Sequence, residues 1–240
     1  MAIALVRKSW GIISPFCRDF LTLFYPERCR VCEQPLLETE KCLCLSCQLD
    51  LPETNYEKDP NNPVAQRFWG RIKLSHASSY LYFQKGGAVQ MLIHELKYRN
   101  NLQVGFFLGL RYGNKLKKNS SLYNIDGIFP VPLFPGKLKE RGYNQSEIIA
   151  KGIAKAFGLP PRLNILVKSK KTATQTRKGR FLRWKNMEEV FEVLGKLDDF
   201  NHILLVDDVV TTGSTLEACA NALVKIKPDL EISVVTLACS

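Results

Sequence analysis

No uninterrupted apolar run in this chain of 240 residues reaches the roughly 18 residues that a membrane-spanning helix needs. Charged residues, among them Arg7, Lys8, Arg18 and Asp19, interrupt the apolar stretch at the start, residues 1–29. It also lacks the basic segment, the clean apolar segment and the small-residue cleavage site of a secretory signal. We therefore expect no stable membrane insertion and no export to an oxidising compartment.

Helical spacing is nevertheless visible in the same stretch, at Trp10, Ile13, Phe20, Leu21 and Phe24. This spacing predicts a short amphipathic helix that packs on the rest of the protein. Basic amphipathic helices also bind membrane surfaces, so a helix that lies on a membrane is the alternative.

Acidic residues are scarce, with 23 Asp and Glu against 34 Lys and Arg, which gives a net charge of +11. Two segments contain no acid at all: residues 97–118 hold six Lys or Arg, and residues 168–185 hold eight. Such a surplus favours a polyanionic partner or a phosphate-rich ligand. Internal repeats and low-complexity tracts are absent as well, and hydrophobic residues make up 45% of the chain, enough for a sizeable core.

Cysteine is not scarce, and five of the eight cysteines lie within residues 29–47. Two C-x-x-C pairs stand out, Cys29 with Cys32 and Cys44 with Cys47. Each pair places two thiolates on one metal from a tight turn, and two such turns make a tetrahedral four-cysteine zinc site. Cys42 is a spare that could replace Cys44 as a ligand.

The alternative for these cysteines is a disulfide or a set of reduced thiols, which the lack of a secretory signal disfavours. The remaining cysteines, Cys17, Cys219 and Cys239, sit in apolar surroundings and are expected to be core residues.

The positions of these features divide the chain into two domains. Residues 1–60 are expected to form a small unit held together by zinc, because so short a segment has little core of its own. The polar, Pro- and Asn-rich residues 51–63 are expected to be a linker. Residues 66–240 form the second domain.

Strand and helix patterns alternate along the second domain. Strands are expected at 75–83, 126–133, 202–208 and 231–239, and helices at 86–100, 104–118, 144–159 and 214–228. This alternation predicts an α/β fold with a parallel sheet flanked by helices, in which ligands bind at the carboxyl ends of the strands.

The segment "ILLVDDVVTTGST", residues 203–215, combines a buried strand with polar groups in an unusual order. Four aliphatic residues run into Asp207 and Asp208, which are placed to accept hydrogen bonds from the hydroxyls of a sugar. Gly213 and the hydroxyl residues around it then enter a helix, whose free amides and side chains can bind a phosphate. An acidic turn followed by an ordinary helix cap is the alternative.

This segment resembles the phosphoribosyl-pyrophosphate (PRPP) signature of type I phosphoribosyltransferases. The resemblance implies that the acid pair contacts the ribose, that the loop holds the 5′-phosphate, and that Mg²⁺ bridges pyrophosphate and ribose oxygens. The PRPP-binding residues that it implies are Asp207, Asp208, Val209, Val210, Thr211, Thr212, Gly213, Ser214 and Thr215.

Nearly the whole chain resembles the ComF family of competence-associated proteins. The resemblance rests on the paired cysteines, on "LIHELKYRNN", on "VPLFPGKLKERGYNQSEIIAKGIA" with its Arg-Gly-Tyr-Asn-Gln element at 141–145, and on "KTATQTRKGRFLRWKN". It implies a cytoplasmic bacterial protein with a zinc-binding unit and a phosphoribosyltransferase domain. It also implies a role in DNA uptake during natural transformation, with a competence helicase as a partner.

The basic segment 168–185 corresponds to the loop that closes over PRPP in type I phosphoribosyltransferases and excludes water during the reaction. Thr172, Gln175, Arg183 and Asn186 fit the ComF pattern in this loop, whereas Lys178 stands where a leucine is expected. Lys137 and Arg141 follow the strand at 126, where the family binds pyrophosphate. We therefore expect Asp207, Asp208, Lys137 and Arg141 to take part in catalysis.

Two functions remain open from the sequence. The first is an enzyme that moves a phosphoribosyl group from PRPP to a nitrogenous acceptor, mainly by electrostatic stabilisation of the leaving pyrophosphate. The second is a single-stranded-DNA-binding protein that uses the PRPP pocket for recognition or regulation without catalysis. Its basic segments would bind phosphates, and its Tyr or Trp residues would stack on bases.

Overall fold

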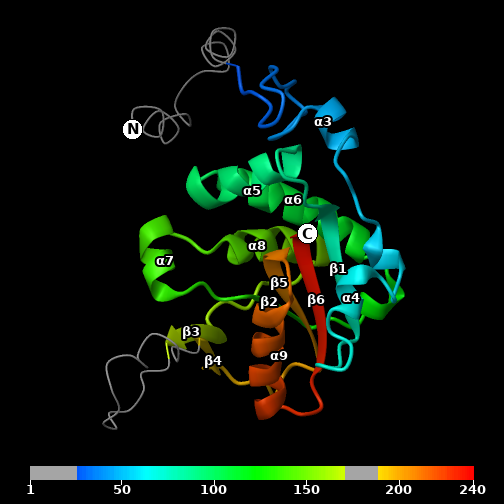
Figure 1. Ribbon diagram of the computed structural model, residues 1–240, viewed down its shortest axis with the longest axis vertical. Coiled ribbons are helices and arrows are strands. Elements are labelled where there is room, and N and C mark those ends of the chain that lie inside the picture. The colour runs from blue at the N-terminus through cyan, green and yellow to red at the C-terminus, as the bar shows by residue number, and fades with distance from the viewer. Residues whose placement is uncertain (1–25, 171–188) are drawn as a thin grey trace. The chain divides into compact units, whose positions relative to one another are not determined.

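The structure is a computed structural model that describes residues 26–170 and 189–240 (Figure 1). The chain divides into two compact units, one ending at Asp50 and the other running from Leu51 to Ser240. The amphipathic helix expected within residues 1–29 and most of the basic loop lie outside the described residues. Within the described part of the chain, no helix is both long and apolar enough to cross a membrane.

The first unit contains little regular structure in its described part. It has one short helix, α3 (Leu45–Leu49), and two isolated bridges, between Arg28 and Pro35 and between Lys41 and Leu43. Cys44 is the residue that precedes the helix. Because these elements are short, a unit of this size depends on cross-links between its side chains for stability, as expected for a cysteine-rich unit.

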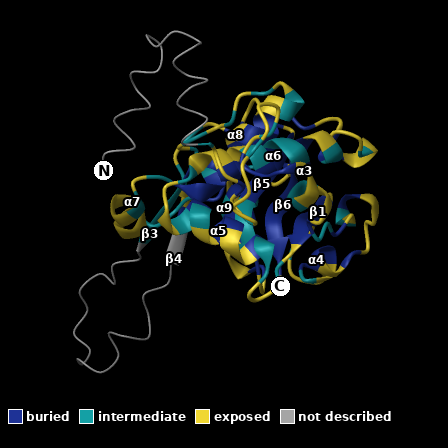
Figure 2. Ribbon diagram, turned by 90° about the horizontal axis from the view of Figure 1, so that it is seen from above, coloured by how far each residue is buried: buried dark blue, intermediate teal, exposed yellow. Residues whose placement is uncertain are grey.

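The second unit is built on a parallel sheet of four strands in the order β1-β6-β5-β2 (Figure 1). The strands are β1 (His76–Tyr82), β2 (Gly127–Pro130), β5 (His202–Val210) and β6 (Glu231–Cys239). β5 is central, and Leu204 on this strand pairs with Ile128 on β2 and with Ser233 on β6. The first five residues of β5 are buried, as expected for a strand that is covered on both faces (Figure 2).

Helices cover both faces of this sheet. Ile203 and Leu205 of β5 belong to the hydrophobic core that also contains residues of α9 (Ser214–Ile226) and α4 (Pro63–Gln66). Because side chains alternate along a strand, Leu204 and Val206 face the other side, where α8 (Gln145–Phe157) packs on β5 and β2. α6 (Leu102–Leu116) packs on α8, and α5 (Ala88–Tyr98) packs on α6. The predicted α/β class, a parallel sheet flanked by helices, is confirmed.

The segment expected to be a linker, residues 51–63, is instead part of the second unit. The backbone of Thr54 donates to Tyr80 (2.9 Å), and that of Tyr82 donates to Pro52 (2.9 Å). The side chain of Asn62 donates to the carbonyl of Ala77 (2.8 Å) and caps α4. The expectation was wrong because these polar residues satisfy the free backbone groups of β1, which lies at the edge of the sheet. A 3₁₀ turn, η2 (Tyr56–Lys58), lies within this segment, and a second, η3 (Ser120–Leu122), precedes β2.

The sequence did not predict three further elements. α7 (Pro135–Arg141) follows β2. β3 (Leu166–Lys170) and β4 (Glu189–Val193) form an antiparallel pair, with Lys168 opposite Phe191. The basic segment that begins at Lys168 therefore starts within a strand, and residues 171–188 lie outside the description.

Glycines set the distance between α6 and α8. A Cβ added at Gly109 would overlap the carbonyl oxygen of Ile149, and one added at Gly152 would overlap that of Phe106. Gly113 lies against Ala156 and Ile153 in the same contact. The two helices therefore touch through their backbones, which no side chain larger than hydrogen permits at these positions.

We expect Gly109→Ala to lower the free energy of unfolding by about 1–3 kcal/mol, because the added methyl forces the two helices apart. Urea unfolding followed by circular dichroism measures the change. Gly136→Ala in the exposed helix α7 is the matched control, and its effect should be neutral or slightly stabilising because alanine favours the helix. Equal stability of Gly109→Ala and the wild type would show that the helices are not locked by this contact.

Candidate functional site

The acid pair lies near the carboxyl end of β5, where the neighbouring strand has turned away. β2 ends at Pro130, opposite Val206, and the backbone of Val131 makes the last bond to Val206 (2.9 Å). Asp207 still pairs with Thr236 on β6, and β5 continues to Val210. The acids are thus part of the strand and border the gap that β2 leaves.

Asp207 is held by two hydrogen bonds to one carboxylate oxygen. The Ser146 hydroxyl donates to Oδ1 (2.8 Å), and the backbone of Asp208 donates to the same atom (2.9 Å). Burial, and then the charge of Asp208, raise the pKa of Asp207 from its ordinary value of 3.8 to about 7, although both hydrogen bonds and Lys97 oppose the rise. The carboxyl of Asp207 is therefore protonated in a large fraction of molecules near neutral pH.

Asp208 is neutralised by a lysine from another element. Lys97 Nζ lies 2.8 Å from Asp208 Oδ2, and both side chains are largely buried. Lys97 belongs to the last turn of α5, so this helix end supplies the cation that the acid pair needs. The sequence placed Lys97 in a basic segment and in the "LIHELKYRNN" motif, and gave no indication that it pairs with Asp208.

The Arg-Gly-Tyr-Asn-Gln element connects four parts of the fold. Gly142 ends α7 with a φ of 80°, which favours glycine, and Asn144 caps α8 by accepting from the backbone of Ser146 (3.1 Å). The Asn144 side chain also donates to Val131 (2.9 Å), just after β2. Tyr143 donates to the carbonyl of Leu96, near the end of α5. The element thereby fixes both Ser146 and the helix end that carries Lys97.

The two residues expected to bind pyrophosphate differ in their surroundings. Arg141 donates to Gln145 Oε1 (2.9 Å) and lies over the ring of Tyr98, 5.2 Å from its centroid. It is therefore next to the end of α5, and hence near Lys97. Lys137 is exposed on α7, and no hydrogen bond or ion pair among the described residues joins it to the acid pair.

The loop after β5 adopts a shape suited to bind an anion. Gly213 has a φ of 81° and precedes α9, and a Cβ there would lie 2.8 Å from the ring of Phe68. Thr212 and Ser214 share a hydroxyl hydrogen bond of 2.8 Å. Thr211, Thr212, Ser214 and Thr215 are exposed, and Val209 and Val210 join the loop to the acids within β5. The first amides of α9 have no acceptor within the helix.

Two arginines that the sequence did not single out hold this loop from behind. Arg67 donates to the carbonyls of Val210 (3.2 Å) and Thr211, and Arg71 donates to that of Thr212 (2.9 Å). Arg71 also pairs with Glu217 in the first turn of α9, so the loop carbonyls and this carboxylate all have cationic partners. The neutralisation of these negative groups favours an anion at the start of α9.

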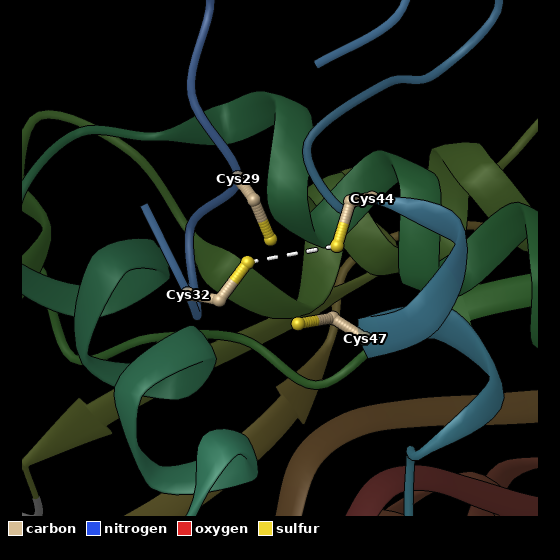
Figure 3. Close-up of side chains that lie close together, drawn as sticks. All are labelled: Cys29, Cys32, Cys44 and Cys47. Atoms are coloured by element: carbon tan, nitrogen blue, oxygen red, sulfur yellow. Dashed lines mark hydrogen bonds between the residues drawn. The ribbon is translucent and has the colours of Figure 1, made fainter. Parts of the chain in front are cut away.

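The four predicted cysteine ligands form the second candidate site. The sulfur atoms of Cys29, Cys32, Cys44 and Cys47 all lie within 4.8 Å of one another. Figure 3 shows their side chains pointing toward one another, with 3.6 Å between the sulfurs of Cys32 and Cys44. Such a group could hold one metal ion. Cys42, the alternative ligand, is not a member of this group, and its backbone lies in the left-handed region with a φ of 64°.

The thiols of this group have very different pKa values in the metal-free chain. Burial raises the pKa of Cys29, but backbone amides of Cys32, Cys44 and Val31 that donate to its sulfur lower it overall to about 6. Burial and the neighbouring sulfurs raise the pKa of Cys47 far above its usual value. Four thiolates so close together therefore require a cation. None of the seven described cysteines is in a disulfide, and Cys219 and Cys239 are buried core residues, as predicted.

Curated proteins of similar sequence are linked by name to competence and DNA utilization. The chain is 30% identical to Competence protein F of Haemophilus influenzae over 146 residues, which cover 58% of this chain and 62% of that protein. It is 29% identical to DNA utilization protein YhgH of Salmonella typhimurium over 212 residues, 87% of this chain and 89% of that protein. It is 32% identical to Competence protein ComFC of Bacillus subtilis over 111 residues, 46% of this chain and 43% of that protein. This chain is similar in sequence to ComF proteins.

The resemblance to the ComF family predicted from the sequence is thereby confirmed. The match to Competence protein F spans less than two thirds of that protein's length. No protein-family model matches the chain.

Among solved structures, the chain is similar to a Helicobacter pylori xanthine-guanine-hypoxanthine phosphoribosyltransferase. The TM-score is 0.35 at 14% identity, over 56% of this chain and 81% of that chain. A hypoxanthine-guanine phosphoribosyltransferase of L. donovani gives a TM-score of 0.34 at 16% identity, over 57% and 67% of the two chains.

We expect Asp207→Asn to raise the free energy of unfolding at pH 8 by at least about 1 kcal/mol. A shift of one pKa unit corresponds to about 1.4 kcal/mol, so this expectation is a conservative one. The folded chain keeps a proton on Asp207 that the unfolded chain releases, so the wild type loses stability as the pH rises from about 3.8 through about 7. The advantage of the variant should shrink as the pH falls to 4.

Urea unfolding at several pH values measures this difference. Asp199→Asn, at an exposed position, is the control and should show no such trend. A constant difference between Asp207→Asn and the wild type at all pH values would show that Asp207 has an ordinary pKa.

Proposed function

We propose that this chain binds PRPP together with Mg²⁺ at the carboxyl end of β5 and transfers its phosphoribosyl group to a nitrogenous acceptor. The observation that carries the proposal is that an acidic pair and an anion-binding helix start lie next to each other along residues 207–215. The partly buried acid pair is suited to accept hydrogen bonds from a diol. The start of α9 is suited to bind a phosphate, because Arg67 and Arg71 bind the carbonyls of the loop before it. A ribose 5-phosphate matches both in that order.

Each part of the site has a distinct task in this proposal. Asp207 and Asp208 orient the ribose hydroxyls. Thr211, Thr212, Gly213, Ser214 and Thr215 bind the 5′-phosphate, and Val209 and Val210 join the two. Arg141 and Lys137 stabilise the negative charge on the pyrophosphate as its bond to the ribose breaks. Arg141 is already held near the acid pair by Gln145 and Tyr98, whereas Lys137 must move toward the ligand from its exposed position.

Carboxylates and phosphate oxygens are the ligands that Mg²⁺ prefers. When bound with PRPP, the ion would neutralise charge on the pyrophosphate. The residues beside it are Asp207 and Asp208, whose charge is balanced by Lys97 in the ligand-free chain.

We further propose that Cys29, Cys32, Cys44 and Cys47 hold a structural zinc ion. A tetrahedral ion with Zn–S bonds of about 2.3 Å places its sulfurs roughly 3.8 Å apart. The distance of 3.6 Å between Cys32 and Cys44 agrees with this value. All four positions around the ion are taken by sulfur, so the site has no open position for catalysis.

The names of the relatives, which refer to competence and DNA utilization, support a role in DNA uptake or utilization. The proposal includes a cytoplasmic location and a competence helicase as partner. Single-stranded-DNA binding without catalysis is the second candidate. It is favoured by Tyr98, which follows Lys97 and is 63% exposed, and by the exposed side chain of Arg99. An aromatic ring next to cations is the arrangement that binds single strands by stacking and phosphate contact.

We expect the double substitution Asp207→Asn, Asp208→Asn to weaken PRPP binding in the presence of Mg²⁺ by at least about 100-fold. It removes the charge from two acceptors, and one hydrogen bond to a charged group contributes about 1.5–3 kcal/mol. Isothermal titration calorimetry measures the affinity, and Asp198→Asn, Asp199→Asn on an exposed loop is the control. Equal PRPP affinity in wild type and double variant would refute the site.

Release of pyrophosphate from PRPP, tested against a panel of bases with and without single-stranded DNA, distinguishes the two candidates. Release that requires a base identifies the transferase. PRPP binding without release, together with DNA binding that falls steeply with salt, identifies the DNA-binding protein.

We expect about one zinc ion per chain in protein purified without chelators. Cys44→Ser and Cys47→Ser should each lose the ion, because a hydroxyl replaces a thiolate ligand. Cys42→Ser is the matched control and should keep it. Elemental analysis by plasma mass spectrometry measures the content, and a zinc-free wild type would contradict the assignment.

A further inference from the structure

The second unit contains a cavity of about 370 Å³ that the PRPP site does not use. It is lined by Glu57, Lys58, Lys115, Lys118, Asn119 and Ser120. Lys115 lies near the end of α6, about 20 Å along the helix from Leu102 at a rise of 1.5 Å per residue. Leu102 follows shortly after Lys97, so most of the length of α6 separates the cavity from the acid pair.

The lining of this cavity is polar and mainly cationic. Lys58 and Lys118 are exposed, and Asn119 and Ser120 add amide and hydroxyl groups. Lys115 is paired with Glu53 and Glu57, so the two exposed ammonium groups of Lys58 and Lys118 are the ones that favour an anionic ligand. The volume lies at the lower end of the range for small-molecule pockets, about 300–1,000 Å³, which suits a mononucleotide better than a dinucleotide.

Glu57 is the unusual member of this lining. Its side chain is 3% exposed, and neither carboxylate oxygen accepts a hydrogen bond from the described residues. Buried polar atoms are nearly always hydrogen-bonded, and leaving a charged one without a donor is costly. Both oxygens are enclosed, so a ligand with two parallel donors reaches them by displacing the groups that cover them.

Lys115 is the ionic partner of Glu57, and its contacts show how a ligand gains access. Lys115 Nζ lies 2.6 Å from Glu53 Oε2 and 2.8 Å from Asn55 Oδ1, but 3.5 Å from Glu57 Oε1. The contact to Glu57 is the longest of the three. A ligand donor can replace it while Lys115 keeps its two shorter contacts.

The backbone around Glu57 is fixed independently of any ligand. The side chain of Asn119 donates to the carbonyl of Glu57, and its oxygen accepts from the backbone of Ser121 (2.9 Å). The two walls of the cavity, η2 and the segment after α6, are therefore joined.

We propose that this cavity binds a guanine nucleotide. The N1–H and the 2-amino group of guanine form a planar pair of donors that matches the two oxygens of a carboxylate, and the phosphate lies with Lys58 and Lys118. A guanidinium ligand offers a similar donor pair, but its positive charge is repelled by Lys58 and Lys118. Adenine presents an acceptor at N1 to Glu57, and hypoxanthine lacks the 2-amino donor.

Calorimetric titration of the full chain with GMP, IMP and AMP tests this assignment. We expect GMP to bind at least tenfold more tightly than IMP, because IMP leaves one buried oxygen of Glu57 without a donor, and AMP to bind more weakly still. Glu57→Gln should reduce the preference for GMP over IMP to less than threefold. Lys58→Ala, Lys118→Ala should weaken GMP and IMP binding alike by at least tenfold, and both replaced lysines are exposed, so the variant is expected to fold.

Asp207→Asn, Asp208→Asn separates this cavity from the PRPP site and should leave GMP binding unchanged. Titration with dGMP and with a 5′-phosphorylated oligonucleotide that begins in dG or dA identifies the source of the guanine, a free nucleotide or a DNA end. Three results would overturn the assignment: equal affinity for the three nucleotides, no binding at millimolar concentration, or loss of GMP binding in the aspartate double variant. The last result would place the nucleotide at β5 and would leave the PRPP proposal standing.

Discussion

The ion pair between Lys97 and Asp208 allows the central strand to carry two adjacent acids near its carboxyl end. Two buried carboxylates without a cation would repel each other and destabilise the strand that carries them. Lys97 balances one of them, and Asp207 responds to burial by holding its proton more tightly. Much of the surrounding structure serves to bring this lysine and the Ser146 hydroxyl to the same strand end.

The two partners of the acids come from helices that are themselves connected. α5 supplies Lys97, α8 supplies Ser146, and α6 packs on both helices. Tyr143 adds a direct link, because it precedes α8 and donates to Leu96 in α5. The Arg-Gly-Tyr-Asn-Gln element and the "LIHELKYRNN" motif thus act together. They hold Ser146 and Lys97 next to the two carboxylates.

Elements with strong local patterns could be predicted from the sequence. The strand at 231–239 agrees with β6 residue for residue, and the helix at 144–159 ends near Gly158, whose φ is 74°. The loop at 211–215 was recognised because its glycine, hydroxyls and following helix lie together in the chain. The cysteine pairs were recognised for the same reason: each pair is local, and only the joining of the two pairs depends on the fold.

What could not be predicted depends on contacts between residues far apart in the chain. Arg67 lies about 140 residues before the carbonyls that it binds, and nothing near it in sequence indicates that role. The segment 51–63 has the composition of a linker, yet it covers an edge strand that is itself defined only by the order of the sheet. Helix α7 is short and begins with Pro and Gly, so its pattern was too weak to detect.

The glycine contact between α6 and α8 has a consequence for how this protein tolerates change. Gly109 touches no part of either candidate site, yet the spacing that it permits positions the helices that supply Lys97 and Ser146. An additional methyl group at Gly109 would shift these helices, and with them Lys97 and Ser146, relative to the acids on β5. The distance between two backbones thus affects the geometry of the acid pair from a position that a catalogue of residues close to the acids would omit.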